Sequence, residues 1–204
     1  GIMMGKGLPF GDESTMVFAG TLPLAFHPQA KLAANIGFGS GLTTHTLLST
    51  PQLTRVDTIE IEPAMVQGAR HFLPRVRNAY EDPRSRIHIE DAKTYFASRG
   101  TRYDIIVSEP SNPWVSGVSS LFSEEFYRRI TTHLRDDGVF VQWVQLYEIS
   151  IDLVVSILKA VSSSFGDYAV YTTNGGDLII MAGKQGQLRP LDYSVFSVPE
   201  IEAA

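Results

Sequence analysis

The chain has 204 residues, of which 44% are hydrophobic and 19% charged, so it is long enough for about one domain with a single core. Its 17 Lys and Arg residues against 22 Asp and Glu residues give a net charge of −5, which argues against nucleic acid as a partner. The absence of cysteine excludes disulfides and thiolate metal sites, and no apolar run approaches the ~18 residues of a membrane-spanning helix, so no direct membrane insertion of this segment is expected.

In chain order, the sequence predicts an irregular lead-in and then alternating strands and helices. Residues 1–30 lack a sustained period and predict the remnant of an N-terminal segment with one short helix around Ser14–Ala25. From residue 31, short apolar runs that end in glycine or acidic residues alternate with stretches of helical period. They predict strands at 32–37, 56–61, 86–90 and 103–109, with helices at 42–49, 64–73 and 92–98.

The second half continues this alternation and then ends differently. A helix over 123–135, with Ser123 as its N-cap, precedes a strand over 138–146 and a helix over about 150–165. Strands 168–172 and 177–182 flank Asn174-Gly175, a strong hairpin signal, so the sheet should end antiparallel. The pattern predicts an α/β fold with a mostly parallel, doubly wound sheet over residues 31–183 and a loosely ordered tail over 184–204.

The first strand runs into a glycine loop that opens a helix. Gly37, Gly39 and Gly41 alternate with Phe38 and Ser40. Glycine is needed where the backbone turns sharply or a ligand approaches the main chain closely, and a nucleoside is the usual ligand at such a junction. A tight turn without a ligand is the alternative interpretation.

Acidic residues follow the next two strands. Glu60 lies 19 residues after Gly41, close to the ~20-residue offset at which a carboxylate accepts hydrogen bonds from ribose hydroxyls. Asp91 also lies at the carboxyl edge of the predicted sheet, where it is placed to accept a hydrogen bond from an adenine amino group. By spacing alone, the simpler role of Asp91 is to cap the helix that begins at Ala92.

The fourth strand ends in a rigid loop that carries polar and aromatic groups. Residues 103–114 read YDIIVSEPSNPW, with Glu109 placed to enter the same crevice as the nucleoside. Trp114 either contacts substrate or fills a hydrophobic gap.

Several of these segments, in order and spacing, resemble the spermidine synthase family of aminopropyltransferases. The likeness spans about residues 10–182 and is greatest to the spermidine-synthase-like domains fused to membrane transporter-like segments. The family likeness is carried by these segments: Gly37–Gly41, Ile59–Pro63, Glu90–Ala92, Tyr103–Pro113 and Leu121–Tyr127. The likeness to the transporter-fused domains is carried by the loop Ser111–Phe122.

The resemblance implies a seven-stranded sheet of the class I S-adenosylmethionine-dependent methyltransferase type and a nucleoside donor, S-adenosylmethionine or its decarboxylated form. The residues it assigns to the donor are Gly37, Gly39, Ser40, Gly41, Glu60, Ile61, Asp91 and Ala92. Glu109 stands where the family has an aspartate that acts as base toward the attacking amine, and Asn112 and Trp114 would contact that amine. The resemblance also implies a homodimer in the cytoplasm, or the soluble domain of a membrane protein. No metal is expected, because the histidines show no metal-ligand spacing with one another and the chain has no cysteine.

The sequence also departs from that family. Ser40 and Asn112 stand where the family usually has aspartates, and residues 12–16 lack the tyrosine-containing pair expected before Leu22-Pro23. The chain opens on Gly1-Ile2 and suggests a piece of a longer protein. Three functions therefore stay open: aminopropyl transfer to a small amine, methyl transfer, and nucleoside binding without catalysis in a larger membrane protein.

Overall fold

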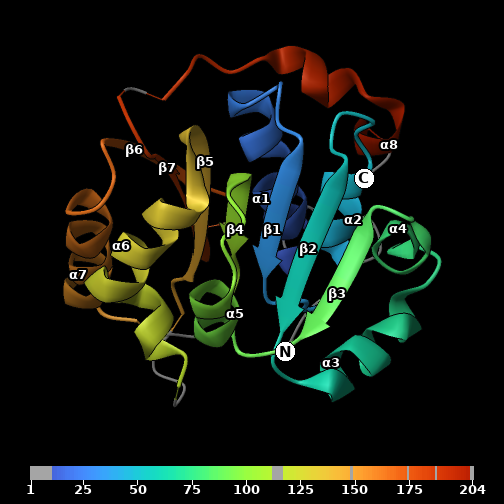
Figure 1. Cartoon of the computed structure of the whole chain (residues 1–204), viewed down its shortest axis with the longest axis horizontal. Coiled ribbons are helices and arrows are strands. Elements are labelled where there is room, and N and C mark those ends of the chain that lie inside the picture. Colours follow the sequence, from blue (N-terminus) through green and yellow to red (C-terminus); the bar gives the residue numbers. More distant parts are fainter. Residues whose placement is uncertain (1–10, 112–116, 148, 174, 187, 203–204) are drawn as a thin grey trace.

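Seven strands form one sheet in the order β3-β2-β1-β4-β5-β7-β6 (Figure 1). Only β7 runs against its neighbours, β5 and β6, and the other pairs are parallel. This computed structural model describes residues 11–111, 117–147, 149–173, 175–186 and 188–202. The strands are β1 (Leu32–Ile36), β2 (Arg55–Glu60), β3 (Ser85–Ile89), β4 (Tyr103–Ser108), β5 (Leu134–Gln145), β6 (Asp167–Thr172) and β7 (Asp177–Gly183). The predicted α/β fold, with its mostly parallel seven-stranded sheet and antiparallel last strand, is confirmed.

Helices cover both faces of the sheet. They are α1 (Asp12–Phe26), α2 (Leu42–Leu48), α3 (Pro63–Gly68), α4 (Arg77–Glu81), α5 (Ala92–Ser98), α6 (Glu124–His133), α7 (Ile151–Ser162) and α8 (Pro199–Glu202), with short 3₁₀ turns η1 (Ala69–Phe72), η2 (Ser119–Phe122) and η3 (Tyr193–Ser197). One core cluster joins α5, α6 and α7 to the sheet around Phe96, Tyr127 and Phe140. A second large cluster joins α1, α2 and the C-terminal segment around Leu24 and Leu47.

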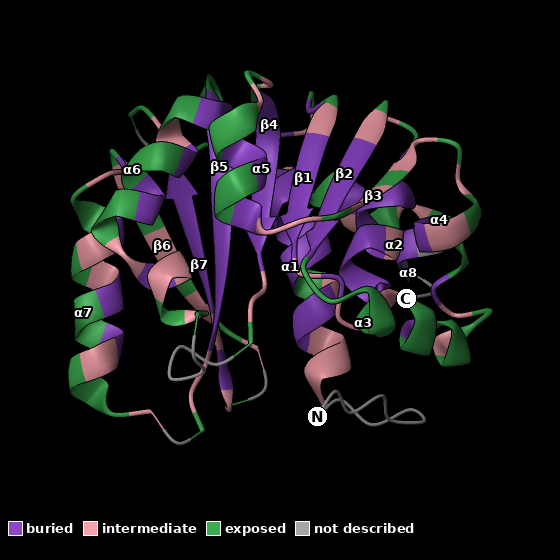
Figure 2. Cartoon of the chain, turned by 60° about the horizontal axis from the view of Figure 1, so that its bottom comes forward, coloured by how far each residue is buried: buried purple, intermediate pink, exposed green. Residues whose placement is uncertain are grey.

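The central strands are buried on both faces, which explains why their sequences are continuous apolar runs and not alternating ones. Every residue of β4 is buried, and Figure 2 shows β1, β4 and β5 almost wholly purple between the helices. Because both faces of these strands are closed by helices, the only parts of β1, β2 and β4 that remain open to a ligand are their ends.

Two predicted boundaries differ from the structure. The helix predicted over 64–73 stops at Gly68 and continues as η1, and α4 was not predicted. No residue of α3 is buried, so packing does not extend this helix. Strand β5 begins at Leu134 and not at 138, because Leu134 already pairs with Tyr103 of β4. The next pair joins Val139 to Ile105, so residues 135–138 form a bulge opposite Asp104.

The two ends of the described chain also differ from the prediction. The short helix predicted around Ser14–Ala25 is present as α1, but the lead-in is not irregular, because α1 carries Leu24 and Phe26 deep into the core. Residue 31 is therefore not a boundary between structural units. The sequence predicts a loosely ordered tail, but Val195 and Ile201 are buried against the same core cluster, and the Asp192 amide donates to the Ala25 carbonyl.

Within the described ranges, none of the helices has the length and apolar character needed to cross a bilayer. The predicted N-cap at Ser123 is confirmed, since its hydroxyl accepts a hydrogen bond from the Phe126 amide. The hairpin residue Asn174 lies outside the described residues. Strands β6 and β7 on either side of it pair antiparallel, as predicted.

Candidate active site

The glycine loop joins the carboxyl end of β1 to α2 and lies against the end of β4. Gly37, Gly39 and Gly41 all have positive φ angles, of 96°, 52° and 87°, which favour glycine. A Cβ on Gly37 would lie 2.7 Å from the carbonyl oxygen of Glu109, so only glycine fits this approach. The Glu109 amide donates to the Ile36 carbonyl at 2.9 Å, which fixes the two strand ends relative to each other.

Glu109 is held at the end of β4 by donors from two other elements. Its Oε1 accepts a hydrogen bond from Asn35 Nδ2 of β1 at 2.6 Å, and its Oε2 accepts one from Thr43 Oγ1 of α2 at 2.7 Å. Burial raises the pKa of Glu109 to about 8, the two hydrogen bonds oppose that rise, and the negative charge of Glu60 adds to it. The result is an oriented carboxyl group that exchanges its proton near neutral pH, which suits a general base.

Glu60 lies at the end of β2, and its side chain is hydrogen-bonded to the glycine loop. Its Oε2 accepts a hydrogen bond from the Phe38 amide and its Oε1 one from the Glu62 amide, both at 2.8 Å. Each carboxylate oxygen has a second lone pair, so a ribose hydroxyl can still bind there. A ribose contact of Glu60 stays a prediction, as does a donor contact of its neighbour Ile61, a residue that is 67% exposed.

The structure confirms the capping role of Asp91. Its Oδ1 accepts hydrogen bonds from the amide and the hydroxyl of Thr94, at 2.9 and 3.1 Å, and α5 begins at Ala92. The cap places Asp91 at the carboxyl edge beyond β3, next in the sheet to β2. An adenine contact by Asp91 and Ala92 stays a prediction.

Ser40 is not brought to the crevice. Its side chain is completely buried, and its hydroxyl donates to the sulfur of Met16 in α1 at 3.2 Å. The predicted role of Ser40 beside the donor therefore has no open surface in this structure. Asn112 and Trp114, predicted to contact the amine, lie outside the described residues.

Sequence reasoning missed the two residues that hold Glu109. Asn35 carries a side-chain amide within the otherwise apolar and buried strand LAANI. A buried polar side chain needs a hydrogen-bond partner, so its presence in such a strand indicates a polar contact. Thr43 gives no such signal, because threonine is common in the first turn of helices. Its contact with Glu109 depends on how α2 packs against the end of β4.

Three of the four strands β3, β2, β1 and β4 carry an acidic residue at this edge of the sheet. Glu60 is the last residue of β2, Glu90 follows β3 and Glu109 follows β4, and Glu90 is paired with Arg99 at 2.8 Å. Glu60 and Glu109 face the glycine loop from opposite sides of β1. This arrangement favours a ligand that has both a hydrogen-bonding nucleoside part and a positive charge.

The hydrogen bond from Thr43 to Glu109 can be tested by titration. We expect Thr43→Val to raise the pKa of Glu109 by about one unit above that of the unaltered chain, because a donor to the charged form is lost. Carbon NMR of the Glu109 carboxyl group measures this directly.

Thr46 provides a matched control in the same helix. It is fully buried, and its hydroxyl has no hydrogen-bond partner among the described residues. Thr46→Val should leave the pKa of Glu109 where it is. Equal pKa values in both variants would contradict the role assigned to Thr43.

Comparison with known proteins identifies the family. The model of the spermine/spermidine synthase domain matches residues 16–175. A polyamine aminopropyltransferase of Moorella thermoacetica is 30% identical over 152 residues, which cover 74% of this chain and 53% of that protein. A polyamine aminopropyltransferase of Nitrosomonas europaea is 29% identical over 181 residues, 87% of this chain and 55% of that protein. The chain thus spans about half the length of the curated relatives it matches.

Solved structures agree on the fold. A spermidine synthase in complex with the transition-state analogue AdoDATO has a TM-score of 0.78 at 21% identity, covering 95% of this chain and 76% of that one. Human methyltransferase-like protein 13, in complex with SAH, has a TM-score of 0.65 at 20% identity, covering 93% of this chain and 89% of that one. The fold is therefore methyltransferase-like, and by the match over residues 16–175 the chain belongs to the spermine/spermidine synthase family.

Proposed function

We propose that this chain transfers an aminopropyl group from decarboxylated S-adenosylmethionine to an amine, with Glu109 as the base. The observation that carries the proposal is the carboxyl group of Glu109, oriented by Asn35 and Thr43 beside the glycine loop. The names of the matched relatives, polyamine aminopropyltransferases, support the same reaction.

The reaction needs one proton acceptor and no acid. The amine nitrogen attacks the carbon next to the sulfonium, the new C–N bond forms as the C–S bond breaks, and the electron pair leaves with sulfur as a neutral thioether. The proton released by the amine nitrogen passes to Glu109. A single carboxylate is therefore sufficient.

The raised pKa of Glu109 suits it to this task. An alkylammonium group has a pKa of ~10.4, so transfer of its proton to a carboxylate of ordinary pKa 4.5 costs about 8 kcal/mol. Transfer to a carboxylate with a pKa of about 8 costs about 3 kcal/mol. Burial of Glu109 thus lowers the cost of generating the neutral amine, which is the form that attacks.

The departures at Ser40 and Asn112 bear on the acceptor. Two carboxylates that would pair with a polyamine dication are missing from these positions, and the Ser40 hydroxyl is occupied by Met16. Fewer negative charges weaken the attraction for a second ammonium group. We therefore propose a small amine as acceptor, bound with less dependence on its distal charge.

Parallel calorimetric titration with decarboxylated S-adenosylmethionine, S-adenosylmethionine and methylthioadenosine tests the donor. The decarboxylated compound should bind more tightly than the intact one, and methylthioadenosine should appear when a panel of linear amines is added. Preference for the intact compound, with methylated product, would replace the proposal with methyl transfer. If none of the three compounds binds, this chain has no working donor site and the proposal is wrong.

The homodimer and the cytoplasmic location stay predictions.

A further inference from the structure

The edge of the sheet opposite the glycine loop carries a cluster that the proposed reaction does not use. His27 follows the last residue of α1, Asp104 lies near the start of β4, and Asp137 lies in the bulge of β5. One ligand atom from each residue lies within 4.8 Å of the other two. Strand β1, five residues long, separates this edge from the glycine loop by about 16 Å.

The imidazole of His27 is an unsatisfied buried group. The residue is 3% exposed, and neither ring nitrogen has a hydrogen-bond partner within the described part of the chain. Its Nε2 lies 3.4 Å from Asp137 Oδ2, an ion-pair distance without hydrogen-bond geometry. A buried polar group that makes no hydrogen bond is a place for an ion or a water molecule. The backbone of His27 is fixed in place, because the His27 amide donates to the Pro23 carbonyl and the His27 carbonyl accepts from the Ala30 amide.

Asp104 is a second fixed ligand. Its Oδ2 accepts hydrogen bonds from the amides of Lys31 and Leu32, both at 2.8 Å, and its side chain is 5% exposed. Those bonds orient its other oxygen, Oδ1, which lies 3.2 Å from the guanidinium of Arg135. The Arg135 side chain is 48% exposed and is free to turn toward water when an ion replaces it.

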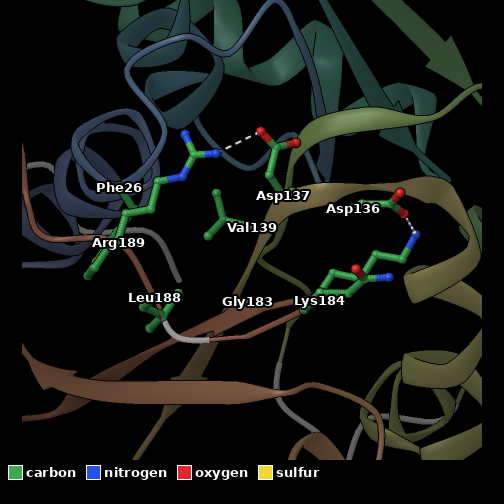
Figure 3. Close-up of a pocket in the computed structure, with 10 residues that line it drawn as sticks. Phe26, Asp136, Asp137, Val139, Gly183, Lys184, Leu188 and Arg189 are labelled. Atoms are coloured by element: carbon green, nitrogen blue, oxygen red, sulfur yellow. Dashed lines mark hydrogen bonds and ion pairs between the residues drawn. The ribbon is translucent and has the colours of Figure 1, made fainter.

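Asp137 completes the cluster and lines a cavity of about 300 Å³ together with Phe26, Leu188 and Arg189 (Figure 3). Its Oδ2 lies 3.4 Å from Nε2 of His27 and 2.8 Å from Arg189. Two ligands of a tetrahedral Zn²⁺ ion, each about 2.1 Å from the metal, are also about 3.4 Å apart. Of the three residues of the cluster, Asp137 is the one that lines this cavity.

We propose that His27, Asp104 and Asp137 bind a divalent first-row cation such as Zn²⁺. One imidazole nitrogen with two carboxylates is a ligand set suited to Zn²⁺ or Mn²⁺ and less suited to Mg²⁺ or Ca²⁺, which favour oxygen alone. Two positive charges on the ion balance the two carboxylates, as Arg135 and Arg189 do without it. The ion ties the end of α1 to β4 and β5 and so has a structural role.

Sequence spacing could not reveal this site. The histidines show no metal-ligand spacing with one another, and the ligands are 77 and 33 residues apart in the chain, from 27 to 104 and from 104 to 137. The expectation that no metal binds depended on the spacing of the histidines and on the absence of cysteine. The bulge of β5 brings Asp137 to the other two residues.

The proposal is tested by titrating the chelator-treated chain with two metals. Binding of ZnCl₂ is measured by calorimetry, and binding of Co²⁺ by its visible absorption. We expect one ion per chain and a higher melting temperature with Zn²⁺. Asp137→Asn and His27→Gln should weaken Zn²⁺ binding at least about tenfold, since even changes to outer-sphere partners have such effects. Arg189→Gln should strengthen it, because a competing cation is removed.

Asp136→Asn is the matched control. Asp136 precedes Asp137, lines the same cavity and pairs with Lys184 at 3.1 Å, but it does not belong to the cluster. The Asp136→Asn variant loses one negative charge, as Asp137→Asn does, and should leave Zn²⁺ binding unchanged. Because the Asp137 side chain is 49% exposed, its variant should fold normally even if His27→Gln does not. Absence of Zn²⁺ binding, or equal binding by the Asp136 and Asp137 variants, would overturn the proposal.

Discussion

Glu109→Gln should lower the rate of group transfer by about 10²–10⁴-fold, the contribution of a positioned general base. Glutamine can keep a hydrogen bond through its side-chain oxygen to Asn35 or to Thr43, but it has no basic group to accept the amine proton. Donor binding should change little, since the loop and Glu60 are untouched. Single-turnover kinetics and donor titration measure the two effects separately.

Glu109→Asp is the informative companion variant. It keeps the carboxylate but shortens the side chain by one methylene, which withdraws it from Asn35 and Thr43. We expect an intermediate rate, above that of the Gln variant. Turnover of the Gln variant close to that of the unaltered chain would remove Glu109 from the mechanism.

The raised pKa of Glu109 also predicts how pH acts. The base form becomes populated as the pH rises through about 8, so the rate should rise across that range and lose this limb in Glu109→Gln. Stability changes with pH in the opposite direction. Between pH 4.5 and about 8, Glu109 keeps its proton in the folded chain but has lost it in the unfolded chain. The free energy of unfolding therefore falls as the pH rises through this window. Urea denaturation below and above this window should show a smaller fall in the Gln variant.

The parts of the fold that follow from local pattern were predictable. Buried strands such as β1 and β4 are short apolar runs, and each ends at glycine or an acidic residue. Their boundaries agree with the prediction to within about a residue. The glycine loop and Glu109 were predictable for the same reason, since the parallel strands of such a sheet bring their carboxyl ends to one edge.

The parts that depend on contacts between distant segments were not predictable. Thr43 reaches Glu109 only because α2 packs beside β4, and α1 belongs to the core although its apolar residues show no clear stripe. The bulge of β5 falls between the helix predicted over 123–135 and the strand predicted from 138, and its residues Asp136-Asp137-Gly138 are typical of a break between elements. In each case the deciding interaction joins residues far apart in the sequence.

Gly37→Ala should both destabilise the chain and displace the base. The new Cβ would lie 2.7 Å from the carbonyl oxygen of Glu109 and 3.4 Å from its Cγ, and alanine disfavours a φ of 96°. The backbone conformation alone costs about 1–2 kcal/mol, and the contact adds to it because both strand ends are hydrogen-bonded in place. If the strand ends separate to make room, Glu109 moves, and a shift of about 1 Å in a catalytic group can lower a rate ~10²-fold.

Gly68→Ala separates this effect from that of glycine replacement in general. Gly68 has a helical φ of −64°, and a Cβ there has no neighbour within 4 Å. This variant should be more stable by about 0.5–1 kcal/mol and fully active, because alanine reduces the freedom of the unfolded chain. Urea denaturation and the transfer rate of both variants decide the matter. A Gly37→Ala chain as stable and as active as Gly68→Ala would mean that the ends of β1 and β4 do not approach as closely as the loop geometry requires.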